Sequence, residues 1–144
     1  MRRFGVDPNT IQTVLISHLH GDHFGGLPFL LDAQFVSRRT TPLTIAGPPT
    51  LSARLRALRE TMFPGSTDAD LGFLMDIIAL APQVTAQVNG VSVTPYPVRH
   101  PSGAPSFALR CQVGHQTLCY SGDTEWIPVL GEAARGADVF IAAC

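Results

Sequence analysis

One short stretch, Ser17 to Gly26, concentrates side chains that bind divalent metal ions. It reads Ser-His-Leu-His-Gly-Asp-His-Phe-Gly-Gly and holds three histidines and one aspartate within six residues. Neutral imidazole and carboxylate are the groups that hold a divalent ion in a nitrogen and oxygen site. His18 and His20 are two positions apart, so in an extended segment both point the same way. The stretch therefore predicts a fold organised around a metal-binding loop.

The second ligand pair of this loop is formed by two adjacent residues, Asp22 and His23. Adjacent side chains need an irregular turn to face the same way, and Gly21 permits one because it has no Cβ to clash at positive φ. Two pairs on one tight loop can serve two ions side by side. The alternative, a histidine-rich surface loop with no partner, is less favoured because short histidine tracts are typical of metal sites.

The residues before the loop indicate where it stands in the fold. Thr13-Val-Leu-Ile-Ser17 is a short, continuous and largely β-branched apolar run, which is typical of a buried strand in a parallel or mixed sheet. The loop therefore leaves the carboxyl end of a buried strand, where open α/β sheets place their binding sites.

The pattern His18-x-His20-x-Asp22-His23 after an apolar strand resembles the signature of the metallo-β-lactamase fold superfamily. The longer string from Ser17 to Pro28 is similar to its ribonuclease Z and phosphodiesterase-like branch. The resemblance implies an α/β fold, the four-layer αββα sandwich. It also implies two divalent ions, zinc first with manganese or iron as alternatives. The implied reaction is attack by a metal-activated hydroxide on an ester, amide or phosphodiester.

Two further residues become candidate ligands once the resemblance is granted. His100 follows a predicted strand and resembles the family's third histidine, although a lone histidine is more often structural. Asp123, in Tyr-Ser-Gly-Asp-Thr, resembles the aspartate that bridges the two ions. The implied sets are His18, His20 and His100 for one ion, and Asp22, His23 and Asp123 for the other. Asp22 is the candidate catalytic residue, because it can orient the attacking water and accept its proton.

Composition limits the partners and the compartment. A chain of 144 residues, 45% hydrophobic, suits one globular domain. The net charge of −1 does not indicate nucleic acid, although a local patch or a metal pair could still bind phosphate. Cys111, Cys119 and Cys144 form no paired framework and suit a reducing compartment. We therefore expect a cytoplasmic protein without a membrane segment that acts on a small ester or phosphodiester, with a homodimer left open.

The remaining pattern predicts the other elements. Helices are expected over 29–36, 51–62 and 126–134, and strands over 43–47, 84–88, 91–94, 106–113, 116–120 and 137–142. The helix over 51–62 has an apolar stripe formed by Leu51, Leu55, Leu58 and Met62. Its arginines at 54, 56 and 59 are interpreted as a solvated face, with phosphate binding as the alternative. Pro95 and Pro97 predict that central strand pairing does not continue beyond Thr94.

The sequence also departs from the family pattern. No histidine follows Asp123, where the family supplies a further ligand, and Ala143 stands where the ribonuclease Z branch carries a glutamate. We therefore expect residues 1–144 to form a single partial domain, truncated at both ends and lacking the N-terminal hairpin and the C-terminal part. Such a piece exposes sheet edges and apolar faces. The alternatives to a phosphodiesterase are a lactonase or thioesterase, or a non-catalytic metal-binding fragment.

Overall fold

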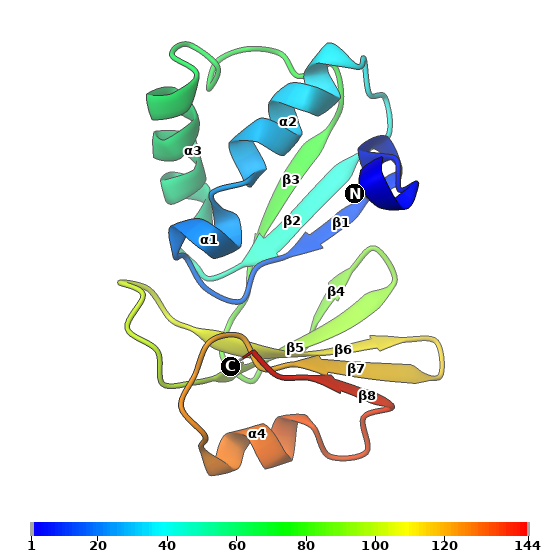
Figure 1. Ribbon diagram of the computed structural model, residues 1–144, viewed down its shortest axis with the longest axis vertical. Helices are drawn as coiled ribbons and strands as arrows, with labels where there is room; N and C mark the ends of the chain where they lie inside the picture. Colours follow the sequence, from blue (N-terminus) through cyan, green and yellow to red (C-terminus); the bar gives the residue numbers. More distant parts are fainter. Residues whose placement is uncertain (1, 144) are drawn as a thin grey trace.

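The computed structural model describes residues 2–143, which form four layers (Figure 1). Helices α1 to α3 cover one face of a three-stranded sheet, a five-stranded sheet lies against its other face, and α4 covers the outer face of that second sheet. The expected αββα sandwich is therefore confirmed. Among the described residues, no helix combines the length and the apolar run needed to cross a membrane.

The first sheet is parallel and carries the helices on one side. Its strands are β1 (Thr13–Leu15), β2 (Leu43–Gly47) and β3 (Met75–Ala79), paired in that order. Its helices are α1 (Gly21–Phe24), α2 (Leu27–Val36) and α3 (Leu51–Met62). Because parallel strands end at the same edge of a sheet, the loop after β1 lies beside the loop after β2. Short 3₁₀ turns at Arg2–Phe4 and Pro8–Thr10 precede β1.

The second sheet is mostly antiparallel. It contains β4 (Ala86–Val88), β5 (Val91–Pro97), β6 (Phe107–Val113), β7 (Gln116–Tyr120) and β8 (Val139–Ile141), with β8 parallel to β7. Helix α4 (Pro128–Ala133) lies in the connection from β7 to β8. Asn89 and Gly90 both have positive φ, as the predicted two-residue hairpin turn requires. Both predicted hairpins are present.

Three apolar cores separate the four layers. Leu31, Leu43, Ile45 and Leu55 are among the residues that join the helices to the first sheet. A second core, which includes Val93 and Phe107, fills the space between the two sheets. A third lies between the second sheet and α4 and contains Ala108, Cys119, Leu130 and Ala133. Each element therefore buries one apolar face, as a layered domain requires.

The expectation that strand pairing stops before Pro95 is wrong. Strand β5 continues to Pro97 and pairs with β6 from Ser92 to Pro97, with Pro95 opposite Leu109 and Pro97 opposite Phe107. The next pair is hydrogen-bonded, from the Val98 amide to the Ser106 carbonyl, and hydrogen-bonded pairs alternate along an antiparallel ladder. Both prolines therefore occupy pairs that need no amide donor toward β6. On the other side of β5, strand β4 begins only at Ala86, opposite Val93, and does not pair with the prolines.

Helix α4 and strand β1 also differ from the sequence-based expectation. Helix α4 begins at Pro128 rather than Trp126, because Ile127 is extended and proline suits the first helical position. Trp126 is 79% exposed in the preceding loop. Strand β1 ends at Leu15 and is only half-buried, since among the described residues it forms an edge of its sheet. The burial expected for β1 begins one residue later, at Ile16.

Candidate metal centre

The ligand loop continues the direction of β1 and then turns into a one-turn helix. The Ile16 amide donates to the Ala46 carbonyl at 2.8 Å, and His20 is still extended at the start of α1. Gly21 therefore begins a helical turn that carries Asp22 and His23, and it does not adopt the positive φ expected from the sequence. In this loop it is Gly25 that lies too close to other backbone atoms to carry a side chain, because a Cβ there would lie 2.3 Å from the Gly21 carbonyl oxygen.

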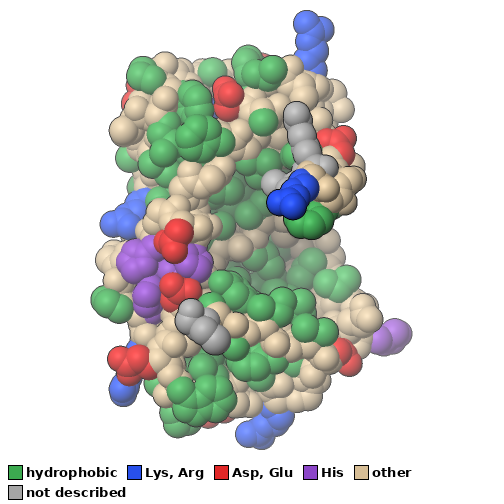
Figure 2. Space-filling view, viewed as in Figure 1, with side chains coloured by type: hydrophobic (Ala, Val, Ile, Leu, Met, Phe, Trp, Pro, Cys, Tyr) green, Lys and Arg blue, Asp and Glu red, His purple; other side chains and the backbone are tan. Residues whose placement is uncertain are grey.

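Three histidines from distant parts of the chain come together. Each of these histidines, at positions 18, 20 and 100, contributes one ring nitrogen. The three nitrogen atoms lie within 4.8 Å of one another. The His100 Nε2 and the His20 Nδ1 are 2.9 Å apart, although 80 residues separate them in sequence. In Figure 2 most of the histidine surface (purple) forms one cluster at the left side of the molecule, next to acidic side chains (red). This group is the first set expected from the sequence.

Asp123 lies between this group and His23. Its Oδ2 is 3.9 Å from the His18 Nε2 and 3.8 Å from the His100 Nε2. Its Oδ1 is 3.3 Å from the His23 Nε2. The two carboxylate oxygens therefore face different histidines. A second group of ligand atoms within 4.8 Å consists of His18, His23 and Asp123.

Asp22 stands at the rim of the centre. Its Oδ2 is 3.5 Å from the His23 Nε2, but its side chain is 78% exposed and belongs to neither compact group. The second set expected from the sequence, with Asp22, His23 and Asp123, is thus only partly assembled. The remaining histidine, His115, is exposed at the tip of the β6–β7 hairpin and joins no ligand group.

His18 is the buried member of the centre. It is fully enclosed, its Nδ1 is 3.1 Å from the Ser17 Oγ, and its Nε2 has no hydrogen-bond partner. Burial, together with the neighbouring His23, lowers the pKa of His18 to about 4. The imidazole is therefore neutral at neutral pH, which is the form that binds a metal ion. An enclosed nitrogen without a partner costs free energy unless something binds it.

Several small residues fix the ligands in place. The Phe107 amide donates to the Ser17 carbonyl at 2.9 Å, which ties the ligand loop to the second sheet. The Ser106 Oγ donates to the His100 carbonyl at 2.9 Å. Gly122 has a φ of +58°, and a Cβ there would lie 2.8 Å from the Phe107 carbonyl oxygen and 3.0 Å from the Ser17 Cβ. Neither Ser106 nor Gly122 is recognisable from the sequence as a site residue, because isolated serines and glycines are common in loops.

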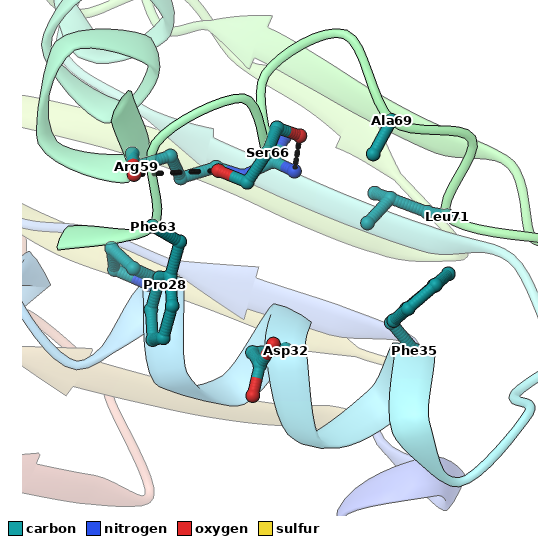
Figure 3. Close-up of a pocket in the computed structure, with 8 residues that line it drawn as sticks. All are labelled: Pro28, Asp32, Phe35, Arg59, Phe63, Ser66, Ala69 and Leu71. Carbon is teal, nitrogen blue, oxygen red and sulfur yellow. Dashed lines mark hydrogen bonds between the residues drawn. The ribbon is translucent and has the colours of Figure 1, made fainter. Parts of the chain in front are cut away.

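Two other hollows lie away from the histidines. A cavity of about 100 Å³ between α2, α3 and the loop after α3 is lined mainly by apolar side chains, as seen in Figure 3. A larger apolar groove of about 450 Å³ opens between β1 and the second sheet. It is bordered by the exposed side chains of Val113, Leu118 and Val139. Neither hollow contains a candidate metal ligand identified from the sequence.

Comparison with known families identifies a match over nearly the whole chain. The family described as the beta-lactamase superfamily domain matches residues 2–144. An uncharacterized protein of Mycobacterium tuberculosis is 34% identical over 138 residues, covering 94% of this chain and 49% of that protein. A ribonuclease Z of Mycobacterium avium is 31% identical over 147 residues, covering 95% of this chain and 52% of the enzyme. The chain thus spans about half the length of these curated relatives.

Solved structures agree on the fold. The metallo-beta-lactamase fold protein YhfI from Bacillus subtilis superimposes with a TM-score of 0.75 at 22% identity, over 99% of this chain and 54% of that one. The short form of human tRNase Z superimposes with a TM-score of 0.72 at 23% identity, over 94% of this chain and 58% of that one. At such low identity these structures support the architecture alone.

Proposed function

The chain belongs to the beta-lactamase superfamily, and on this premise we propose that the protein is a metal-dependent hydrolase that cleaves phosphodiester bonds at a centre of two divalent ions. The observation that carries the proposal is the position of Asp123. One of its carboxylate oxygens faces His23, and the other faces His18 and His100. A carboxylate placed in this way would help to hold two divalent ions side by side, and such a pair would activate water and neutralise charge on the substrate, as in two-metal hydrolases.

The donor set fits divalent metal ions. His18, His20 and His100 would hold one ion through imidazole nitrogens, and Asp123 and His23 would hold the other with Asp22 at its rim. The buried Nε2 of His18 lacks any other partner, which a bound ion would supply. Imidazole and carboxylate suit zinc first, with manganese or iron as alternatives.

The metal ions and the residues around them would have separate roles in hydrolysis. When bound, the ions would lower the pKa of water to about 7 and neutralise negative charge on the phosphoryl oxygens. The Asp22 carboxylate, exposed at the rim and 3.5 Å from the His23 Nε2, would accept the proton of the attacking water. Ser17 would orient His18 by its hydrogen bond to Nδ1, leaving Nε2 as the ligand atom.

A phosphodiester is favoured as substrate because the relatives point to nucleic acid. The Mycobacterium avium relative is named ribonuclease Z, and the human structure is named tRNase Z. The chain itself has a net charge of −1, so any affinity for nucleic acid must come from a local site rather than from a global field. A lactonase or thioesterase is the alternative, and the choice of substrates in the test below separates the two.

The test measures metal content and turnover with the protein at its full natural length. After dialysis at neutral pH, wild-type protein should retain both ions, His18→Ala should lose metal, and His115→Ala should match wild type. Asp22→Ala should hydrolyse bis(p-nitrophenyl) phosphate at least about a hundredfold more slowly, the usual contribution of a general base. A wild-type protein that retains no metal would overturn the site. Hydrolysis of a lactone but of no phosphodiester would favour the alternative.

A further inference from the structure

Helix α3 carries three arginines, and the structure engages two of them. The Arg56 Nη2 lies 3.1 Å from the Asp68 Oδ1, in an exposed ion pair. Arg59 is buried, and its Nη2 donates to the Ser66 carbonyl at 2.5 Å; Figure 3 shows the two residues joined beside the small cavity. Both guanidinium groups are therefore committed to contacts within the helical layer.

The third arginine, Arg54, contacts the backbone of the two segments that supply the three-histidine group. Its Nη1 is 3.3 Å from the Leu19 carbonyl oxygen and 3.5 Å from the Ser102 carbonyl oxygen. Leu19 stands between His18 and His20, and Ser102 follows His100 by two residues. The guanidinium group therefore touches both segments that supply the three-histidine group.

Arg54 also keeps its charge available. Its side chain is exposed, and within residues 2–143 no carboxylate lies within ion-pair distance of it. By contrast Arg99, the neighbour of His100, lies 3.9 Å from Glu125.

The surroundings of Arg54 leave room for a ligand. With Phe24, Ala57, Leu58 and Thr61 it lines a shallow hollow of about 290 Å³ between α3 and α1, the helix that carries Asp22 and His23. Gly103 has a φ of +69°, and a Cβ there would lie 3.3 Å from the Arg54 Nη2. The glycine thus lets the backbone pass the guanidinium group closely without covering it with a side chain.

We propose that Arg54 forms an anion subsite beside the metal centre and binds a phosphate group adjacent to the phosphodiester that is cleaved. This inference rests on the proposed function. A guanidinium group offers a planar fork of donors that matches phosphate oxygens, and such charge-assisted bonds are about twice as strong as neutral ones. The substrate class is therefore a nucleotide chain that carries a further phosphate, rather than an isolated diester.

The test compares three substrates that share one scissile bond. Thymidylyl-thymidine has a single diester, and its 5′- or 3′-phosphorylated forms add a neighbouring phosphate. Wild-type protein of full natural length, loaded with zinc, should have a kcat/KM at least about tenfold higher for one phosphorylated form. Arg54→Met removes the charge but keeps an apolar stem, and it should bring this ratio close to one.

Matched variants distinguish phosphate binding by Arg54 from a purely structural role in holding the two ligand segments. Arg54→Lys keeps the charge and should retain part of the ratio, whereas Arg56→Met, on the same helix, should retain all of it. If Arg54 only braced the two ligand segments, Arg54→Met would slow all three substrates equally or reduce the zinc content, and the ratio would stay at its wild-type value. An unchanged ratio therefore overturns the anion subsite and leaves the phosphodiesterase proposal standing.

Equilibrium binding tests the anion subsite separately from the proposed hydrolytic activity. If wild-type protein hydrolysed none of the dinucleotides, the proposed function would fail, and calorimetric titration with the same dinucleotides would still test the subsite. Tighter binding of a phosphorylated form, lost in Arg54→Met and kept in Arg56→Met, would support the subsite alone. Equal binding of all forms would overturn it.

Discussion

His18 and Asp123 illustrate how much of the site the sequence predicts at the level of single residues. The spacing of the ligand loop and the family resemblance name both residues, and the structure brings them to within 3.9 Å through the His18 Nε2 and the Asp123 Oδ2. The division of the two Asp123 oxygens between His23 and the three-histidine group depends on side-chain rotamers. So does the position of Asp22 at the rim. Spacing in the sequence carries no information about rotamers.

Gly122 is a residue whose role only the structure reveals. It precedes Asp123, and a Cβ at this position would lie too close to Ser17 and to the Phe107 carbonyl oxygen. Gly114 has the same φ of +58°, but a Cβ there would meet nothing within 4 Å. Alanine substitutions at Gly114 and Gly122 therefore separate the free-energy cost of positive φ from that of a close approach.

We predict that Gly122→Ala destabilises the protein by about 3 kcal/mol and Gly114→Ala by about 1 kcal/mol. Both variants bear the strain of alanine at positive φ, and Gly122→Ala must also displace Ser17 or the β6 backbone. Urea unfolding measures the two changes. Gly122→Ala should also hold metal less tightly, because Asp123 and His18 adjoin the displaced groups. Equal free-energy losses in the two variants would show that the close approach has no energetic consequence.

At the level of elements, local patterns predict the type and order of the expected helices and hairpins. Errors arise where the extent or burial of a strand depends on its neighbours in the sheet. The helices over 29–36 and 51–62 and both hairpins were expected from periodicity and turn residues, and they are present. Pro95 and Pro97 were misread because the sequence does not reveal on which side of β5 a partner strand lies. The half-burial of β1 has the same origin, since exposure at a sheet edge depends on the neighbours of the strand.

Helix α3 shows a finer limit of the pattern. The stripe of Leu51, Leu55, Leu58 and Met62 has helical spacing, but burial declines along it: Leu55 is 1% exposed and Met62 is 40% exposed. The helical spacing therefore predicts the buried face of α3 well in its first turns and less well in its last turn.

We predict that Leu55→Ala lowers the free energy of unfolding by about 2–5 kcal/mol, and that Met62→Ala lowers it by less than about 1 kcal/mol. Removing a buried leucine side chain loses its transfer free energy and leaves a cavity, whereas an exposed methionine forms few contacts to lose. Chemical denaturation of both variants gives the comparison. A large loss in Met62→Ala would mean that this face of α3 is covered in solution.

At the level of the whole molecule, three cores hold the four layers together, and the space between the sheets is filled unevenly. Val93 and Phe107 are fully buried there, whereas the apolar groove beside β1 leaves Val113, Leu118 and Val139 exposed. Apolar side chains are therefore exposed beside β1. Their position could not be predicted from the sequence, because within residues 2–143 it depends on how a three-stranded sheet lies against a five-stranded one. Cys111 faces this inter-sheet core.

The inter-sheet core links the stability of the whole molecule to alkaline pH through Cys111. Burial, and to a lesser extent Cys119, raises the pKa of Cys111 to about 11 from an ordinary value of 9.0. The native state thus keeps a proton that the unfolded chain releases. The contribution is complete below pH 9 and is lost as the pH rises from about 9 to 11, at up to about 1.4 kcal/mol per pH unit.

We therefore predict that urea-unfolding free energies of wild-type protein fall between pH 9 and 11, and that Cys111→Ala makes this fall shallower. Burial also raises the pKa of Cys119 and Tyr120, so a part of the slope should remain in the variant. Val93→Ala is the matched control, because Val93 pairs with Cys111 across β5 and β6 but carries no titratable group. It should lower stability at every pH and leave the slope unchanged. A Cys111→Ala slope equal to that of wild type would mean that the thiol ionises in the folded protein as readily as in the unfolded chain.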